Sequence, residues 1–196
     1  MGGNQALQLI KASNTVVPLN IYPNEDIMTA EIEIIEKEIG NVIEIEERVP
    51  MWKMPSIMGK DFNLIMESLK AEGIADMDAP YARYLDVDWE AEMAKGPITL
   101  FIEVFTRKWH FRAGIPTPKK IENSGNLKSA QIPNRRYIKT IHHGPYHKVG
   151  STYKRMYAWA KKQGLSLGKE SMEFYLNDPR ETDRKSLETM VLIPLG

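Results

Sequence analysis

The chain of 196 residues contains no cysteine, which excludes disulfide bonds, thiolate catalysis and cysteine-ligated zinc or iron–sulfur centres. It also has no run of about 18 apolar residues, so neither a transmembrane helix nor a membrane partner is expected. The amino-terminal stretch lacks the compact apolar segment and the cleavage pattern of a secretory signal. Together these absences predict a cytoplasmic protein.

Motifs for phosphate, metal and hydrolytic chemistry are missing as well. No Gly-rich loop carries the Lys-Ser/Thr pair of a phosphate site, and no nucleophile elbow supports Ser-His-Asp chemistry. His142, His143 and His147 lack the spacing of a helical zinc pair, and adjacent residues of a strand point to opposite faces. We therefore expect neither a metal nor a cofactor.

Positive and negative charges balance over the whole chain but are separated along it. Residues 1–106 hold 8 Lys and Arg against 19 Asp and Glu, whereas residues 107–196 hold 18 against 7. Such asymmetry can accompany a nucleic-acid surface, but no nucleic-acid-binding motif comes with it. We expect the two halves to attract each other or to carry solvated faces, and we expect no nucleic-acid partner.

Two predicted helices, over residues 56–72 and 146–163, carry apolar stripes of identical spacing. Adding 91 to each position of Met58, Phe62, Ile65, Met66 and Leu69 gives Val149, Tyr153, Met156, Tyr157 and Ala160. The same offset relates the helix-ending Gly73 to Gly164 and the strand dipeptide Tyr84-Leu85 to Tyr175-Leu176. A matched stripe, cap and strand together predict a structural duplication.

Each repeat has the pattern strand–helix–strand–strand, with repeat one over 42–118 and repeat two over 127–196. The predicted fold class is α+β, with an antiparallel sheet and a central ligand cleft in a domain over 42–196. Two repeats would pack together around a pseudo-two-fold axis, because one unit cannot cover both sides of its sheet. Residues 1–41 form an extension of unknown role, which Gly40-Asn41 could turn into a hairpin with 42–49.

The strand in the segment ESMEFYLNDP, residues 170–179, carries a carboxylate at its middle. Met172, Phe174 and Leu176 alternate with Glu173 and Tyr175. If the apolar set faces the helices, Glu173 and Tyr175 lie together on the opposite side of the sheet, in the concave cleft.

The repeat bears on why that carboxylate is there. The residue equivalent to Glu173 in the first repeat is Ala82, whereas the tyrosine recurs as Tyr84. A charge found in only one copy of a duplicated scaffold indicates a ligand site rather than a support. A solvated glutamate, or one paired with an arginine, is the alternative and the usual fate of a strand glutamate.

Several motifs of the second repeat occur together in one known family. They are His143-Gly144-Pro145-Tyr146 before the helix, Trp159 late in it, Glu173-x-Tyr175, Asp178-Pro179 and the closing Ile193-Pro194. Through these motifs, the segment from His142 to Leu195 resembles the GyrI-like small-molecule-binding superfamily. That superfamily includes effector-binding domains of AraC- and MerR-type transcription regulators. Val42 to Pro118 resembles it more loosely. With no helix-turn-helix evident, the chain is similar to stand-alone members.

The resemblance implies a duplicated fold whose central cleft binds bulky aromatic or cationic compounds. In several members the glutamate that matches Glu173 pairs with the positive charge of the ligand, so a lipophilic or aromatic cation is the expected partner. Some stand-alone members look like hydrolases of cyclopropane-bearing genotoxins, which would make Glu173 catalytic with help from a hydroxyl such as that of Tyr146. A third interpretation is an interaction protein that binds gyrase or a regulator. The sequence leaves these open.

Aromatic side chains would line such a cleft, because their faces attract cations by about 0.5–2 kcal/mol per contact. Tyr84 and Tyr175 are the firmest candidates, since they share the face of Glu173. The other candidates are Trp52, Trp89, Trp109, Phe111, Tyr137 and Tyr146. Core packing is the alternative for about half of them.

Overall fold

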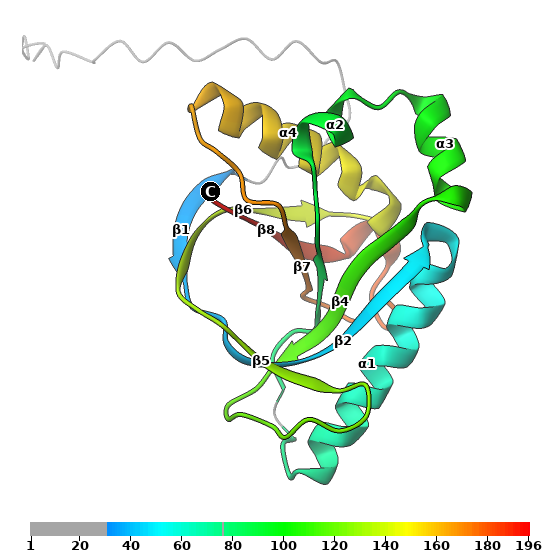
Figure 1. Ribbon diagram of the computed structural model, residues 1–196, viewed down its shortest axis with the longest axis vertical. Helices are drawn as coiled ribbons and strands as arrows, with labels where there is room; N and C mark the ends of the chain where they lie inside the picture. The colour runs from blue at the N-terminus through cyan, green and yellow to red at the C-terminus, as the bar shows by residue number, and fades with distance from the viewer. Residues whose placement is uncertain (1–30, 76) are drawn as a thin grey trace, which may run out of the picture.

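The computed structural model describes residues 31–75 and 77–196 (Figure 1). Its strands are β1 (Glu33–Lys37), β2 (Gly40–Pro50), β3 (Tyr81–Tyr84), β4 (Lys108–Pro116), β5 (Lys128–Ile132), β6 (Arg135–His143), β7 (Ser171–Tyr175) and β8 (Glu188–Pro194). Its helices are α1 (Met54–Ala71), α2 (Trp89–Ala94), α3 (Pro97–Thr106) and α4 (Val149–Lys162), with 3-10 turns η1 (Met51–Lys53), η2 (Tyr146–Lys148) and η3 (Arg184–Ser186). The predicted class, α+β with an antiparallel sheet, is confirmed.

The order of the strands displays the duplication. One eight-stranded sheet runs β1-β6-β8-β7-β3-β4-β2-β5, and every neighbouring pair is antiparallel. Reading outward from the central pair, β7-β8-β6 on one side mirrors β3-β4-β2 on the other. The helices α4 and α1 connect equivalent strands, β6 to β7 and β2 to β3. The two predicted strand–helix–strand–strand repeats are therefore related by a pseudo-two-fold axis between β3 and β7.

The sheet curls strongly, with α1 and α4 outside the curl (Figure 1). Tyr81, Tyr137, Phe174 and other apolar residues pack together on the inner face. Val191, Ile193 and Ile138 on the outer face pack against α4, while strands β2 and β4 pack against α1. Because the curl covers one face and the helices the other, the central strands are buried on both sides. Within the described residues, no helix is long and apolar enough to cross a bilayer.

The predicted hairpin between the amino-terminal extension and residues 42–49 is wrong. The strand β1 pairs with β6 instead, and Gly40-Asn41 lies inside β2, which pairs with both β4 and β5. Part of the predicted extension, residues 33–37, thus adds a strand beside the second repeat. Residues 1–30 lie outside the described residues.

Between β3 and β4 the chain forms the two short helices α2 and α3, which the sequence patterns do not predict. Asp88 caps α2 by accepting a hydrogen bond from the backbone N–H of Ala91 at 3.1 Å. Pro97 stands at the first turn of α3, where its missing N–H is tolerated. The equivalent connection in the second repeat, residues 176–187, forms only the turn η3.

Gly114 allows the closest packing on the inner face. A Cβ atom at this position would lie 2.6 Å from Cζ and Oη of Tyr81, which is fully buried and hydrogen-bonded to Glu44. We expect Gly114→Ala to lower the free energy of unfolding by about 1–3 kcal/mol. Gly59→Ala, in α1, is the control, because a Cβ atom at this position meets no atom within 4 Å. This variant should raise the free energy of unfolding by about 0.5–1 kcal/mol. Urea unfolding checks both, and an unchanged Gly114→Ala would contradict the close approach.

Candidate functional site

Glu173 lies at the middle of β7 and points toward the helices. Its register partner in β8 is Val191, which packs against Met156 and Ala160 of α4. Met172 and Phe174 point instead into the curl. The predicted orientation, with the apolar set against the helices, is therefore wrong, because alternation cannot tell the two faces of a sheet apart when both are buried.

The pseudo-two-fold axis passes beside Glu173. Ala82 and Glu173 are direct register partners across the central strand pair, and they are also equivalent positions of the two repeats. A second carboxylate at position 82 would stand opposite the first on a neighbouring strand, where like charges repel. The alanine in the first repeat therefore leaves this place with a single charge.

Tyrosine hydroxyls surround the carboxylate of Glu173. The Tyr153 hydroxyl, from α4, donates a hydrogen bond to Oε1 at 2.9 Å, and the Tyr175 hydroxyl lies 3.4 Å from Oε2. Tyr84 also contributes a side-chain hydrogen bond that favours the charged form of Glu173. The structure thus brings Tyr84 and Tyr175 to one carboxylate, and adds a third tyrosine from a helix.

Burial dominates the electrostatics of the site. Glu173 is only 5% exposed, and this desolvation raises its pKa from 4.5 to about 7, although the three tyrosine hydrogen bonds lower it. The pKa values of Tyr84, Tyr153 and Tyr175 are raised well above 10, mainly by burial and further by the charge of Glu173. At neutral pH Glu173 is therefore about half ionised, while the tyrosines are neutral donors.

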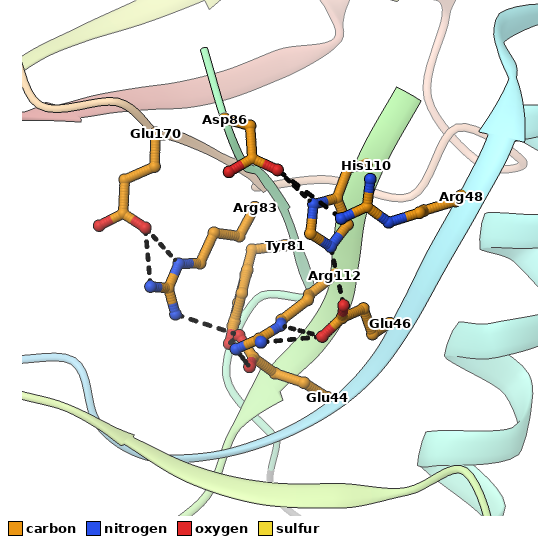
Figure 2. A network of polar contacts seen from close by, with 9 residues as sticks. All are labelled: Glu44, Glu46, Arg48, Tyr81, Arg83, Asp86, His110, Arg112 and Glu170. Atoms are coloured by element: carbon orange, nitrogen blue, oxygen red, sulfur yellow. Dashed lines mark hydrogen bonds and ion pairs between the residues drawn. The ribbon is translucent and has the colours of Figure 1, made fainter. Parts of the chain in front are cut away.

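No cation among the described residues neutralises Glu173, since no Lys, Arg or His charge contributes to its pKa and no ion pair includes it. Glu44, on the inner face, is buried to a similar degree but is fully partnered (Figure 2). It accepts hydrogen bonds from Tyr81 at 2.8 Å and Arg112 at 3.3 Å, and Arg83 lies 3.7 Å away. Among the described residues, one buried glutamate is thus matched with arginines and the other has no counter-charge.

The inner-face network continues from the buried Glu44 to Arg48 and Asp86, whose side chains are exposed (Figure 2). His110 stands between Asp86 and Glu46, with its ring nitrogens 2.7 and 2.8 Å from their carboxylate oxygens. Arg83 donates to Glu170 at 2.7 Å. Every acid of the network has an arginine partner within 4 Å.

Aromatic rings enclose Glu173 and its tyrosines. Tyr146 packs edge-on against Tyr175 with ring centroids 5.3 Å apart. Trp109 and Phe111 contact Tyr84 at 6.1 and 6.3 Å, so both lie on the face of Glu173. The Trp109 indole N–H is buried without a hydrogen-bond partner. These three predicted ligand residues therefore join the aromatic cluster around Glu173.

Two predicted site residues lie elsewhere. Tyr137 is buried on the inner face with Tyr81 and Phe174, because its position in β6 alternates away from the helices. Trp52, in η1, is 58% exposed, and the Lys53 Nζ lies 4.9 Å from its ring centroid. Neither lies beside Glu173, and their predicted ligand role finds no support in this arrangement.

Sequence reasoning missed Tyr153, which it assigned to the apolar stripe of a helix. Phe62 is the equivalent residue in the first repeat, and its ring lies 6.0 Å from Tyr175. Of the two, only the tyrosine carries a hydroxyl, and a buried hydroxyl requires a hydrogen-bond partner. That difference between the repeats parallels the difference between Ala82 and Glu173, and it was the signal available in the sequence.

A groove of about 690 Å³ lies next to the site, between the segment around α2 and the end of α4. Its lining includes Trp89 and Tyr157. Trp89 packs on Tyr153 at 5.7 Å and donates to the Gly168 carbonyl at 2.6 Å. Trp89 and Tyr153 thus separate the groove from Glu173.

The chemistry open to the site is that of one acid in an aromatic enclosure. A carboxylate with a pKa near 7 can hold a cation or exchange a proton at neutral pH. Within residues 31–75 and 77–196, no group of three or more His, Asp or Glu side chains could hold a metal ion.

Comparison with known proteins identifies relatives of this fold. Residues 31–195 match the family described as the GyrI-like small molecule binding domain, while no curated protein matches. The structure of EcmrR in an EcmrR–DNA complex has a TM-score of 0.65 at 20% identity, covering 87% of this chain and 59% of that chain. This chain thus spans less than two thirds of EcmrR.

Two smaller proteins share the fold over most of their length. A hydrolase encoded by lin2189 from Listeria innocua has a TM-score of 0.55 at 12% identity, covering 86% of this chain and 92% of that chain. SAV2435, solved bound to tetraphenylphosphonium, has a TM-score of 0.54 at 10% identity, covering 86% and 94%. With EcmrR solved on DNA, the expected lack of a nucleic-acid partner stays a prediction, as does the cytoplasmic location.

Proposed function

We propose that this chain, which belongs to the GyrI-like small molecule binding domain family, binds lipophilic aromatic cations at Glu173. The observation that carries the proposal is a carboxylate buried without a counter-charge. An ionised carboxylate in such a place is costly unless a cation accompanies it. Glu44 is neutralised by arginines, whereas Glu173 keeps its charge available for a partner from outside.

The surroundings of Glu173 favour a flat, apolar cation over a small hydrated one. Tyr84, Tyr146, Tyr153 and Tyr175 offer ring faces and edges together with their hydroxyls. Aromatic faces attract a cation by about 0.5–2 kcal/mol per contact and also provide apolar area. The solved complex of SAV2435, which has the same fold, contains tetraphenylphosphonium and supports this class of ligand.

A ligand reaches Glu173 only when aromatic side chains move, because their rings fill its immediate surroundings. The groove beside Trp89 and Tyr153 is the proposed route. Tyr175, which would have to move, contacts two residues of α1. Its ring packs against Phe62, and its hydroxyl lies 3.4 Å from the sulfur of Met58. None of these contacts is an ion pair, so moving Tyr175 toward α1 separates no pair of buried charges.

The pH dependence of cation binding tests the proposal. Raising the pH from 6 to 8 is expected to strengthen tetraphenylphosphonium binding roughly tenfold, because Glu173, with its pKa of about 7, becomes ionised in that range. The affinity for neutral triphenylphosphine oxide should stay constant. Calorimetric titration at each pH measures both. No cation binding at pH 8, the result expected of an interaction protein without a pocket, would contradict the proposal.

Tyr153→Phe sharpens this test, since it removes the hydrogen bond of 2.9 Å to Glu173. Bonds to charged groups contribute about 1.5–3 kcal/mol, so the pKa of Glu173 should rise by at least about one unit. Cation affinity at pH 7 is expected to fall by about tenfold and to recover at pH 9. Tyr137→Phe is the control, because that hydroxyl is buried on the other face without a partner. Equal losses in both variants would rule out a specific role for Tyr153.

Hydrolysis is a second candidate function, favoured by the pKa of Glu173. A general acid or base works best with a pKa near the operating pH, and that of Glu173 is about 7. Glu173 would take a proton from water and Tyr146 or Tyr153 would assist through its hydroxyl. Incubation with cyclopropane-bearing alkylating compounds, followed by mass spectrometry, distinguishes turnover from binding. A hydrolase would convert the compound, and Glu173→Gln would bind it but convert it far more slowly.

A further inference from the structure

The helix α3 is an addition to the first repeat. It lies in the connection of residues 85–107, where the second repeat has the shorter connection 176–187 and no α-helix. The duplicated sheet is complete without α3, and none of the residues of α3 is buried. Its presence therefore needs a reason other than the core.

The outward side of α3 is its most apolar side. Ile98, Phe101, Ile102 and Phe105 are 76%, 68%, 53% and 58% exposed. Their spacing of i, i+3, i+4 and i+7 puts them on one face of the helix. An amphipathic helix normally turns such a stripe toward a core, and spacings of this kind are the anchors with which helices dock on partners.

The exposed apolar surface continues from α3 onto η1, which α3 contacts. Met51 and Trp52 of η1 are 38% and 58% exposed. From these fractions the six side chains, four on α3 and two on η1, expose on the order of 700 Å², taking roughly 150–250 Å² for a whole large apolar side chain. That exceeds the usual largest patch of a monomer, about 300–600 Å². It approaches the roughly 800 Å² per partner of a standard protein interface.

Charges next to α3 are already paired within the chain. Lys95 donates to Glu103 at 2.8 Å and to Glu92 at 3.0 Å, and Arg107 pairs with both acids. Glu103 is the only ionisable residue of α3 itself. A nucleic acid or an anionic membrane surface would need basic residues on the helix. The partner is therefore a protein surface that is largely apolar.

We infer that this surface, formed by α3 and η1 and here called the α3–η1 face, joins two copies of this chain across a two-fold axis. The same face on a second copy is matched in size and in its apolar stripe, as an isologous contact requires. Its one basic residue is Lys53 of η1, whose Nζ lies 4.9 Å from the centroid of the Trp52 ring. Phe101 and Ile102, at the middle of the stripe, would lie nearest the axis. The inference uses none of the residues around Glu173 and is independent of the proposed ligand.

Sedimentation velocity of the full chain tests the contact. Wild-type protein is expected to be mostly dimeric at about 10 µM, as an apolar interface of this size should hold. The variant carrying Phe101→Glu and Ile102→Glu should be monomeric, with at least a tenfold weaker self-association. Leu64→Glu is the control, because Leu64 is 46% exposed on α1, outside the face. Its dimer should persist. Circular dichroism and a thermal melt verify that all three proteins fold.

The absence of cysteine allows a second measurement. Ile102→Cys should give a disulfide-linked dimer under mild oxidation, because equivalent residues near a two-fold axis approach each other, whereas Leu64→Cys should not. A wild type that stays monomeric to about 100 µM overturns the inference. So does a dimer that survives the double glutamate variant. Binding of monomers to phosphatidylglycerol vesicles through these residues would overturn it in favour of a membrane surface.

Discussion

Glu173→Gln is expected to weaken the binding of a lipophilic cation such as tetraphenylphosphonium by about ten- to a hundredfold at pH 8. That range corresponds to roughly 1.5–3 kcal/mol, the contribution of hydrogen bonds and contacts to a charged group. The substitution preserves the size of the side chain and its capacity to accept from Tyr153 and donate to Tyr175, and removes only the charge. The expected loss therefore reports the electrostatic part of binding.

The neutral ligand provides the control for this prediction. Triphenylphosphine oxide has no charge to pair, so its affinity should change by less than about threefold in Glu173→Gln. Glu44→Gln is not a suitable comparison, because it would leave Arg83 and Arg112 without their buried acceptor. Calorimetric titration of both ligands with both proteins separates the outcomes. An equal loss for cation and neutral ligand would mean that Glu173 shapes the site without supplying a charge to it.

Two buried acids each make a contribution to the free energy of unfolding that should fall as the pH rises from about 4 to 8. Glu173 has its pKa raised from 4.5 to about 7 by burial. Asp61, on the buried side of α1 with Oδ2 unpartnered, has its pKa raised from 3.8 to about 6, mainly by burial and further by Glu47. A raised pKa in the folded state means that the folded protein binds more protons than the unfolded chain in this range. Each acid thus stabilises the fold below its unfolded pKa and loses that contribution as pH rises through the folded one.

The expected change is roughly 3 kcal/mol for each acid between its unfolded and folded pKa, at about 1.4 kcal/mol per pKa unit. Glu173→Gln and Asp61→Asn should therefore be more stable than wild type at pH 8 and equal to it at pH 4. Acids with a lowered pKa, such as Glu46 and Glu103, act in the opposite direction. The difference between wild type and variant at each pH isolates the substituted group.

Urea unfolding at half-unit steps of pH measures these differences. For Glu173→Gln the gain in the free energy of unfolding should develop between about pH 4.5 and 7, and for Asp61→Asn between about pH 3.8 and 6, because these are the unfolded and folded pKa values of the two acids. Because neither acid contributes to the pKa shift of the other, the double variant should show the sum of the gains. If Glu173→Gln is less stable than wild type at pH 8, the fold needs the carboxylate. That result would refute the proposal that Glu173 is left unpaired for a cation.

Local periodicity was enough to establish the duplication. The constant offset of 91 equated the helices, the tyrosines Tyr84 and Tyr175, and the positions Ala82 and Glu173 before any fold was known. The offset predicts the structure correctly because a two-fold axis relates each residue of one repeat to the matching residue of the other. The direct pairing of Ala82 with Glu173 across β3 and β7 is the structural expression of that offset.

Only the tertiary structure decided which side of the sheet holds the site. Alternation along the strand places Glu173 and Phe174 on opposite faces of the sheet. It shows which face lies against the helices only when the other face is exposed to solvent. Here the curl buries the inner face around Tyr81 and Tyr137, so both sets look like core in the sequence. Tyr137, a predicted ligand residue, lies on that inner face, which alternation alone does not reveal.

The sequence likewise does not predict which buried charges are paired. Glu44 and Glu173 are both glutamates in the middle of apolar strands, and nothing local separates them. Their difference arises because β3 and β4 bring Arg83 and Arg112 to Glu44, while three tyrosines reach Glu173. Whether a buried acid has a counter-charge depends on residues distant in the chain. That contact is made by folding and cannot be read from the neighbours of either glutamate.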